Sequence, residues 1–199
     1  MTRVDRYHWQ LVVLHWTLAV LIIGMLALGF LVLAQLPTSD PRDVVILRWH
    51  IVGGAVILVL MLGRVIVRLR KPKPAKATTG TKWLDWLIPL SHYGFYVLIF
   101  LTIGAGALTA LVANLLPTLF LNSGESLPPD FMIYPSFQVH GLLTTILANL
   151  VILHVLAVCY HQFFRKDGLI ARMWLQREKR HGQNPARRAT ENEASAPRS

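Results

Sequence analysis

The sequence predicts an all-α integral membrane protein built as a bundle of four transmembrane helices. The 199-residue chain is 54% hydrophobic and only 15% charged, whereas soluble domains usually carry about 25% charged residues. The charges cluster between four apolar blocks, and each block is long enough for the helix of about 20 residues that crosses a bilayer core. The length of the chain fits a single domain.

The sequence marks the ends of the four apolar blocks. The first contains no formal charge and ends before Pro37; its length and the absence of a small-x-small cleavage site favour a retained helix over a signal peptide. Pro117 follows the third block in the same way. We expect the domain to cover residues 1–175, followed by a basic tail over 176–199 whose composition predicts disorder. The expected spans are about 11–36, 44–67, 90–116 and 137–164.

Lysine and arginine gather outside the spans and give a net charge of +10. The N-terminus, the second connector and the tail are rich in them, whereas the third connector, about 118–136, has none. The positive-inside rule therefore predicts an up-down-up-down bundle with both termini in the cytoplasm. Basic clusters beside apolar blocks indicate contacts with membrane lipid. Nucleic-acid binding, which needs a basic face on a soluble fold, is not expected.

Four histidines lie inside the apolar runs, where ionisable residues are costly and usually functional. If the helices alternate in direction, His50 and His140 share a depth near the outside, and His15 and His154 share a depth nearer the cytoplasm. Two imidazoles at one depth can ligate one haem iron from both sides. His140 and His154 are fourteen residues apart, which is about 21 Å and close to four turns of one helix face.

Other roles for these histidines stay open, among them interhelical hydrogen bonding, proton relay and metal transport. Metal transporters more often place acidic or sulfur ligands at membrane depth, and the first three spans contain no Asp or Glu. The only cysteine, Cys159, cannot form an internal disulfide, and we expect it to be a small buried residue. Because no C-x-x-C-H motif is present, covalent c-type haem is excluded.

Further residues near the expected cytoplasmic ends fit the same chemistry. His92 and His161 suit proton delivery, a quinone headgroup or a haem propionate. The alternative is an interfacial histidine with a water or carbonyl partner. Arg64 and Arg68 suit haem propionates, since arginine matches carboxylates in bidentate geometry; the alternative is snorkelling to lipid phosphates. The Gly53-Gly54 pair, one turn after His50, leaves room either for a macrocycle or for a close helix contact.

Four stretches resemble the bacterial cytochrome b561 family over roughly residues 5–175: L-H-W at 14–16, H-I-V-G-G at 50–54, V-L-M-L-G-R-V-I-V-R-L-R-K-P at 59–72 and H-V-L-A-V-C-Y-H-Q-F-F-R-K-D at 154–167. The resemblance implies a four-helix cytochrome of the bacterial inner membrane with two haems b. It implies that His15 and His154 ligate the inner haem, and that His50 and His140 ligate the outer one. It also implies electron exchange with ubiquinone, and at least one member resembles a superoxide oxidase.

We therefore expect a membrane cytochrome that passes electrons between a donor, such as superoxide or quinol, and ubiquinone or a respiratory partner. A superoxide:ubiquinone oxidoreductase is one form of this activity. An alternative is a haem b anchor subunit that relays electrons from a docked soluble redox protein, such as a dehydrogenase or hydrogenase. A third hypothesis is a haem-free transporter or scaffold.

Overall fold

The structure is a computed structural model that describes residues 8–37, 41–71, 82–121 and 126–166; for Pro41 and residues 82–92 it describes the backbone alone. Within these ranges the chain forms helices and no strand, so the all-α prediction is confirmed. The expected tail over 176–199 lies outside the described residues.

In the part of the chain that the structure describes, five α-helices and four short helical turns follow one another. The first helix, α1 (Trp9–Ala27), continues into a π-helical turn (Leu28–Val32) and a 3-10 turn (Leu33–Gln35). The remaining elements are α2 (Pro41–Arg70), α3 (Lys82–Val112), α4 (Leu115–Phe120), a 3-10 turn (Phe131–Ile133), α5 (Pro135–Tyr160) and a second π-helical turn (His161–Arg165). Pro135 stands in the first turn of α5, where its missing N–H costs no hydrogen bond.

Four of these helical segments are long and apolar enough to cross a membrane: Trp9–Gln35, Arg42–Arg70, Tyr93–Val112 and Pro135–Arg165. They overlap the four expected spans. Their surfaces carry many exposed large apolar side chains, such as Val20 and Leu153. Soluble proteins rarely expose apolar surface over so large an area. Cys159 is also exposed, so our expectation that it is buried within the protein is wrong; its side chain faces outward from α5.

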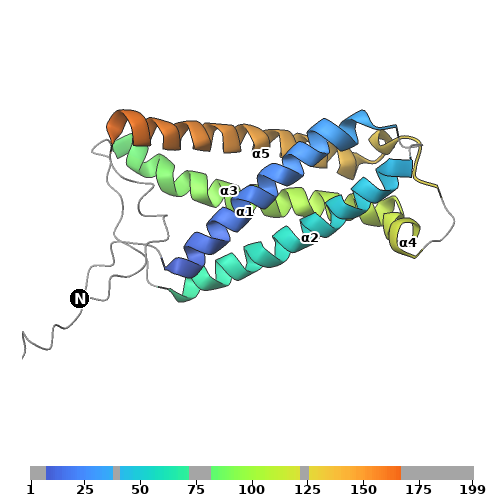
Figure 1. Cartoon of the computed structure of the whole chain (residues 1–199), viewed down its shortest axis with the longest axis horizontal. Coiled ribbons are helices and arrows are strands. Elements are labelled where there is room, and N and C mark those ends of the chain that lie inside the picture. Colours follow the sequence, from blue (N-terminus) through green and yellow to red (C-terminus); the bar gives the residue numbers. More distant parts are fainter. Residues whose placement is uncertain (1–7, 38–40, 72–81, 122–125, 167–199) are drawn as a thin grey trace, which may run out of the picture.

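The third apolar block does not end where the sequence suggested. It was expected to continue to residue 116, but α3 ends at Val112 because Asn114 adopts a left-handed backbone conformation with φ of 51°. Asparagine is one of the few residues that tolerate this conformation. The chain then turns into α4, which buries Leu115 and Leu119 against Leu127. Helix α4 lies across one end of the bundle (Figure 1), which we call the α4 end.

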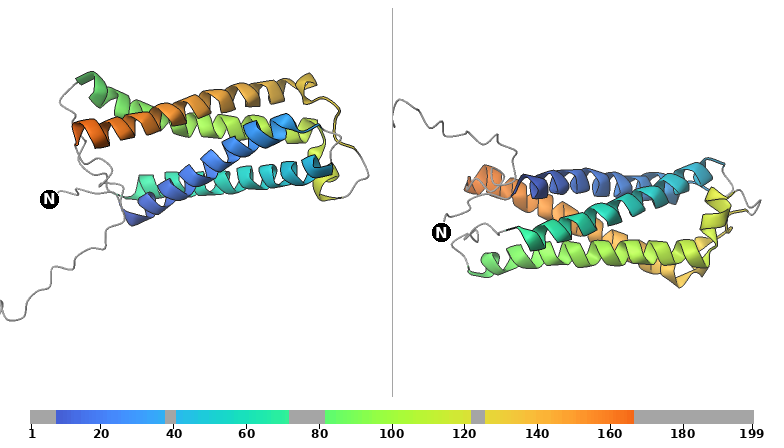
Figure 2. Two further views of the ribbon diagram at one scale, coloured as in Figure 1. Left: turned by 45° about the horizontal axis from the view of Figure 1, so that its top comes forward. Right: turned by 90° about the horizontal axis from the view of Figure 1, so that it is seen from below.

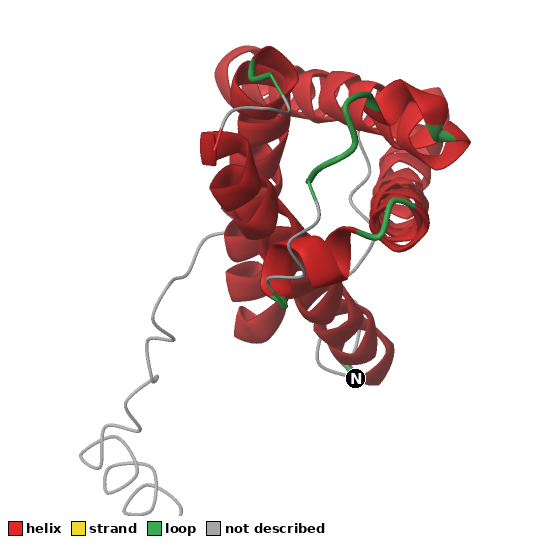
Figure 3. Cartoon of the chain, turned by 90° about the vertical axis from the view of Figure 1, so that its right-hand side faces the viewer, coloured by secondary structure: helices red, strands yellow, loops and turns green. Residues whose placement is uncertain are grey.

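The long helices pack as two pairs, α1 along α2 and α3 along α5. Figure 2 shows the pairs from two further sides, and Figure 3 shows the bundle from the α4 end. The start of α1 and the end of α5 are both at the opposite end of the bundle (Figure 1). Helices α2 and α5 both start at the α4 end and run toward that opposite end.

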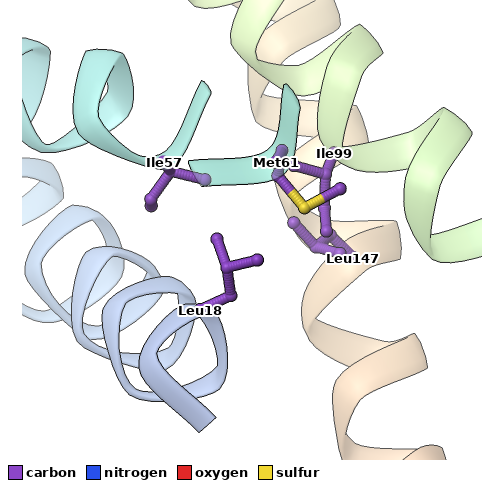
Figure 4. Packing of buried hydrophobic residues seen from close by; sticks show 5 residues of the cluster. All are labelled: Leu18, Ile57, Met61, Ile99 and Leu147. Atoms are coloured by element: carbon purple, nitrogen blue, oxygen red, sulfur yellow. The ribbon is translucent and has the colours of Figure 1, made fainter. Parts of the chain in front are cut away.

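One apolar cluster joins all four long helices in the middle of the bundle. It contains Leu18 of α1, Ile57 and Met61 of α2, Ile99 of α3 and Leu147 of α5. Figure 4 shows these side chains meeting between the helices. We call this set the central cluster. Because it holds α1 and α5 at a fixed height relative to α2, it also fixes the relative depths of the histidines on these helices.

Candidate functional site

His50 of α2 and His140 of α5 face one another near the α4 end. Their ring centroids are 6.2 Å apart and their planes are nearly perpendicular, at 81°. A metal–imidazole nitrogen bond is about 2 Å long, so two imidazoles on opposite sides of one iron have ring centroids about 6 Å apart. The separation in the structure therefore fits a pair of axial ligands to one haem iron.

A backbone contact fixes the orientation of the His140 ring. Its Nδ1 lies 2.9 Å from the carbonyl oxygen of Thr102 on α3. A carbonyl oxygen can only accept a hydrogen bond, so Nδ1 is the donor and carries the proton. The other ring nitrogen, Nε2, is then the one that can bind a metal. Metal-ligating histidines are commonly oriented by such a second hydrogen bond.

One glycine leaves space for the His140 ring, and a second glycine lies beside the His50 ring. A Cβ atom on Gly106 of α3 would lie 3.0 Å from two atoms of the His140 ring, and a Cβ on Gly29 would lie 3.7 Å from Cε1 of His50. Gly29 belongs to the π-helical turn that follows α1; such turns are frequent at functional sites. Among the described residues, Nδ1 of His50 is buried without a hydrogen-bond partner.

His15 and His154 lie on the other side of the central cluster. His15 precedes Leu18 by three residues on α1, and His154 follows Leu147 by seven residues on α5. Both histidines are half-buried, and the ring of Phe95 packs edge-on against His154 at 5.3 Å between centroids. Both therefore lie toward the end opposite α4, and their pairing stays a prediction.

Arg64 and Arg68 occupy the same end on α2. Arg64 is buried, with 8% of its surface exposed; its Nε donates to the hydroxyl of Tyr96 at 3.0 Å, and its Nη1 donates to the carbonyl of Leu11 at 2.9 Å. Arg68 is half-buried and stands over the rings of Tyr93 and Tyr96, at 5.8 and 5.6 Å. Neither of these two contacts of Arg64 is with a carboxylate.

The two candidate quinone residues, His92 and His161, lie on α3 and just after α5. His92 lies on α3, ten residues after its start, and its side chain is outside the described residues. His161 begins the π-helical turn after α5 and packs edge-on against Tyr160 at 5.9 Å between ring centroids.

The Gly53-Gly54 pair lies on α2. A Cβ on Gly53 would lie 2.6 Å from the sulfur of Met25, so this glycine allows a close contact between α1 and α2. A Cβ on Gly54 would meet nothing within 4 Å.

The contributions of Thr102, Gly106 and Tyr96 were not apparent in the sequence. A backbone carbonyl has no residue-type signature, and only the glycines inside an apolar span hinted at close approach. Among the residues that the structure describes, no three His, Cys, Asp or Glu side chains group to hold a metal ion. Haem iron needs only two axial protein ligands, which is what the His50–His140 pair offers.

Comparison with known proteins identifies the family of this chain. The family model described as prokaryotic cytochrome b561 matches residues 6–176, a range that includes all four membrane-capable helices. No curated protein and no solved structure gives a significant match. The family match covers most of the chain and contains every histidine of both pairs, and it implies a membrane protein that binds haem b and takes part in electron transfer. The chain therefore belongs to the prokaryotic cytochrome b561 family.

Proposed function

We propose that this protein is a di-haem membrane cytochrome, with one haem b between His50 and His140 and a second between His15 and His154. The observation that carries the proposal is the 6.2 Å separation of the His50 and His140 rings, since it fits one iron between them. The second pair is supported by position: His15 and His154 lie beyond the central cluster toward one end of the bundle.

The residues around each pair would bind and orient the cofactor. The Thr102 carbonyl holds the proton on Nδ1 of His140, so this imidazole offers its other nitrogen as a ligand. Arg64, and Arg68 one turn later, would bind propionates at the opposite pair. When bound, the haem irons supply one-electron redox chemistry. The central cluster places apolar side chains between the two sites.

We further propose that the bundle lies in the bacterial inner membrane with an up-down-up-down topology and both termini in the cytoplasm. The distribution of Lys and Arg supports this orientation. The His15–His154 pair then serves the inner haem and the His50–His140 pair the outer haem. We use these two names for the sites below.

The proposed electron partner inside the membrane is ubiquinone. His161 supports a quinone site at the cytoplasmic end, because it is half-buried at a π-helical turn beside the stacked rings of Tyr160 and Phe164. The electron donor is superoxide, quinol or a docked dehydrogenase or hydrogenase. Turnover by the purified chain with superoxide and a soluble quinone separates a complete oxidoreductase from an anchor subunit, which needs its partner.

The test of the haem assignment is a reduced-minus-oxidised spectrum of the detergent-purified full chain, with pyridine haemochrome quantitation. We expect two haems b per chain. His140→Ala should leave one, and so should His50→Ala. His181→Ala is a matched control, because it removes a histidine beyond the family match, and it should keep two.

A folded protein purified from haem-replete cells without any haem would overturn the electron-transfer proposal. The haem-free transporter would then be the better hypothesis. One haem in the unmodified chain would retain the cytochrome assignment but remove the two-site arrangement.

A further inference from the structure

Arg64 is a buried cation inside a membrane-capable helix. Only 8% of its surface is exposed, and arginine stays protonated under all ordinary conditions. Its interactions within the described residues are hydrogen bonds to two neutral groups, the hydroxyl of Tyr96 and the carbonyl of Leu11. A positive charge is therefore held among α1, α2 and α3 by two neutral groups, and its counter-charge would be the haem propionate proposed above.

The register between α2 and α5 gives the depth of Arg64. His50 and His140 face each other across these helices, and the two helices run in the same direction (Figure 1). Arg64 follows His50 by fourteen residues, and His154 follows His140 by the same number. Fourteen residues correspond to about 21 Å of α-helix and to nearly four full turns. Arg64 therefore lies near the depth of His154, on the same side of α2 as His50.

The hydrogen bond to Leu11 brings this charge against the helix that carries His15. Leu11 lies four residues before His15 in α1, so its carbonyl is the one that accepts the amide N–H of His15 in the regular helix. Arg64 donates to the same oxygen at 2.9 Å. The cation thus touches the turn of α1 that positions His15.

Among the described residues of α2, no equivalent cation lies on the helix face of His50 near the outer pair. The nearest arginine in sequence, Arg48, precedes His50 by two residues, which places it about 200° around the helix. Its guanidinium stands over the ring of Phe120 in α4, at 5.8 Å. Arg48 therefore contacts α4, on the side of α2 away from His50.

We infer that Arg64 raises the reduction potential of the inner haem above that of the outer haem. This inference rests on the proposed function, because it requires a haem at each pair. A ferric centre carries one more positive charge than a ferrous one, so a fixed nearby cation disfavours the oxidised form. The effect is strong where burial keeps water from screening the charge. The inner haem is then the site where a single electron resides at equilibrium.

The test is a potentiometric titration of the purified full chain, followed by its visible spectrum. Arg64→Gln removes the charge and keeps a hydrogen-bond donor, and it should lower the midpoint potential of the inner haem while leaving that of the outer haem unchanged. Arg64→Lys should restore most of the inner potential. Arg70→Gln is the matched control, since this exposed arginine ends α2 and has no assigned role in the site, and it should give a much smaller shift. His50→Ala removes the outer haem, so the haem that remains in its spectrum is the inner one.

Tyr96→Phe gives a second test if Arg64→Gln fails to fold. It removes one of the two anchors of the guanidinium and should shift the inner potential alone. Two bound haems with unchanged inner potential in every folded variant would overturn the inference and leave the proposed function intact. Equal shifts in the midpoint potentials of both haems would also overturn it, because the charge of Arg64 would then act on both haems alike. A chain without two haems would instead refute the proposed function.

Discussion

A Cβ atom on Gly106 would lie 3.0 Å from both Nδ1 and Cε1 of His140. This distance is too short for ordinary packing, and the His140 ring cannot move freely because the Thr102 carbonyl holds it. Thr102 and Gly106 are four residues apart on α3. One turn of α3 thus provides both the acceptor that orients the histidine and the gap that admits it.

Gly106→Ala should displace His140 and disturb the outer haem. We expect the haem content to fall from two per chain toward one, or the outer haem to give an altered low-spin signal, measured by haemochrome quantitation and electron paramagnetic resonance. Gly104→Ala is the control, because a Cβ there meets nothing within 4 Å. Unchanged haem content and signal in Gly106→Ala would contradict this prediction and show that the His140 ring can shift without disturbing the haem.

The pairing of ligands can be tested with double variants. His15→Ala and His154→Ala should each leave only the outer haem, because each removes one ligand of the same iron. The double variant His15→Ala/His154→Ala should therefore still contain one haem per chain. In contrast, His15→Ala/His50→Ala should contain none. Loss of both haems in the first double variant would contradict the assigned pairing.

Two buried threonines of α3 should differ in what their hydroxyls contribute to stability. The Thr102 hydroxyl is buried without a partner, so Thr102→Val should be neutral or stabilising. The Thr109 hydroxyl lies 3.0 Å from the Ala105 carbonyl and 3.0 Å from the Ser136 hydroxyl, so Thr109→Val should cost about 1 kcal/mol. Thermal melting in one detergent compares the two variants, and equal effects would contradict this difference.

Leu147 should contribute more to stability than a leucine on the outer surface of the same helix. It is 4% exposed in the central cluster, whereas Leu153 is 62% exposed. Leu147→Ala should cost about 2–5 kcal/mol, because it removes contacts and leaves a cavity. Leu153→Ala should change the melting temperature little, since lipid or detergent replaces the lost contacts. A larger loss of stability in Leu153→Ala than in Leu147→Ala would contradict this prediction and indicate that Leu153 contacts another protein surface.

The proposed orientation can be tested by cysteine labelling. The chain has one cysteine, Cys159, so Cys159→Ser gives a cysteine-free background. Ser126→Cys, at an exposed position between α4 and α5, should react with a membrane-impermeant maleimide in spheroplasts. Lys71→Cys, just after α2, should react only after the membrane is opened. The reverse pattern would invert the bundle and exchange the names of the two haem sites.

The sequence was sufficient to predict the four long helices, because a lipid environment demands long apolar runs and places charges at their ends. It also indicated the four histidines, since a polar group inside such a run needs a reason. The termination of α3 at Val112 was missed, because Asn114 sits within an otherwise apolar block and only its left-handed conformation ends the helix.

The surroundings of the histidines were less accessible to sequence reasoning. The contact of His140 with the Thr102 carbonyl depends on how α3 and α5 are rotated against each other. The bond from Arg64 to the Leu11 carbonyl joins residues 53 positions apart. Such contacts follow from helix packing, which a single sequence does not specify, and they involve backbone atoms that every residue has.

The central cluster has a consequence for the energetics of the membrane itself. Its five side chains, Leu18, Ile57, Met61, Ile99 and Leu147, carry no group that can take up or release a proton. An electron passing from one histidine pair to the other would cross this layer, and none of these five side chains could carry a proton with it. Each such transfer would move a net charge against or along the membrane voltage, with a free-energy change of up to about 2.3 kcal/mol for every 100 mV. The cluster would thus make electron transfer through this protein sensitive to the energised state of the cell.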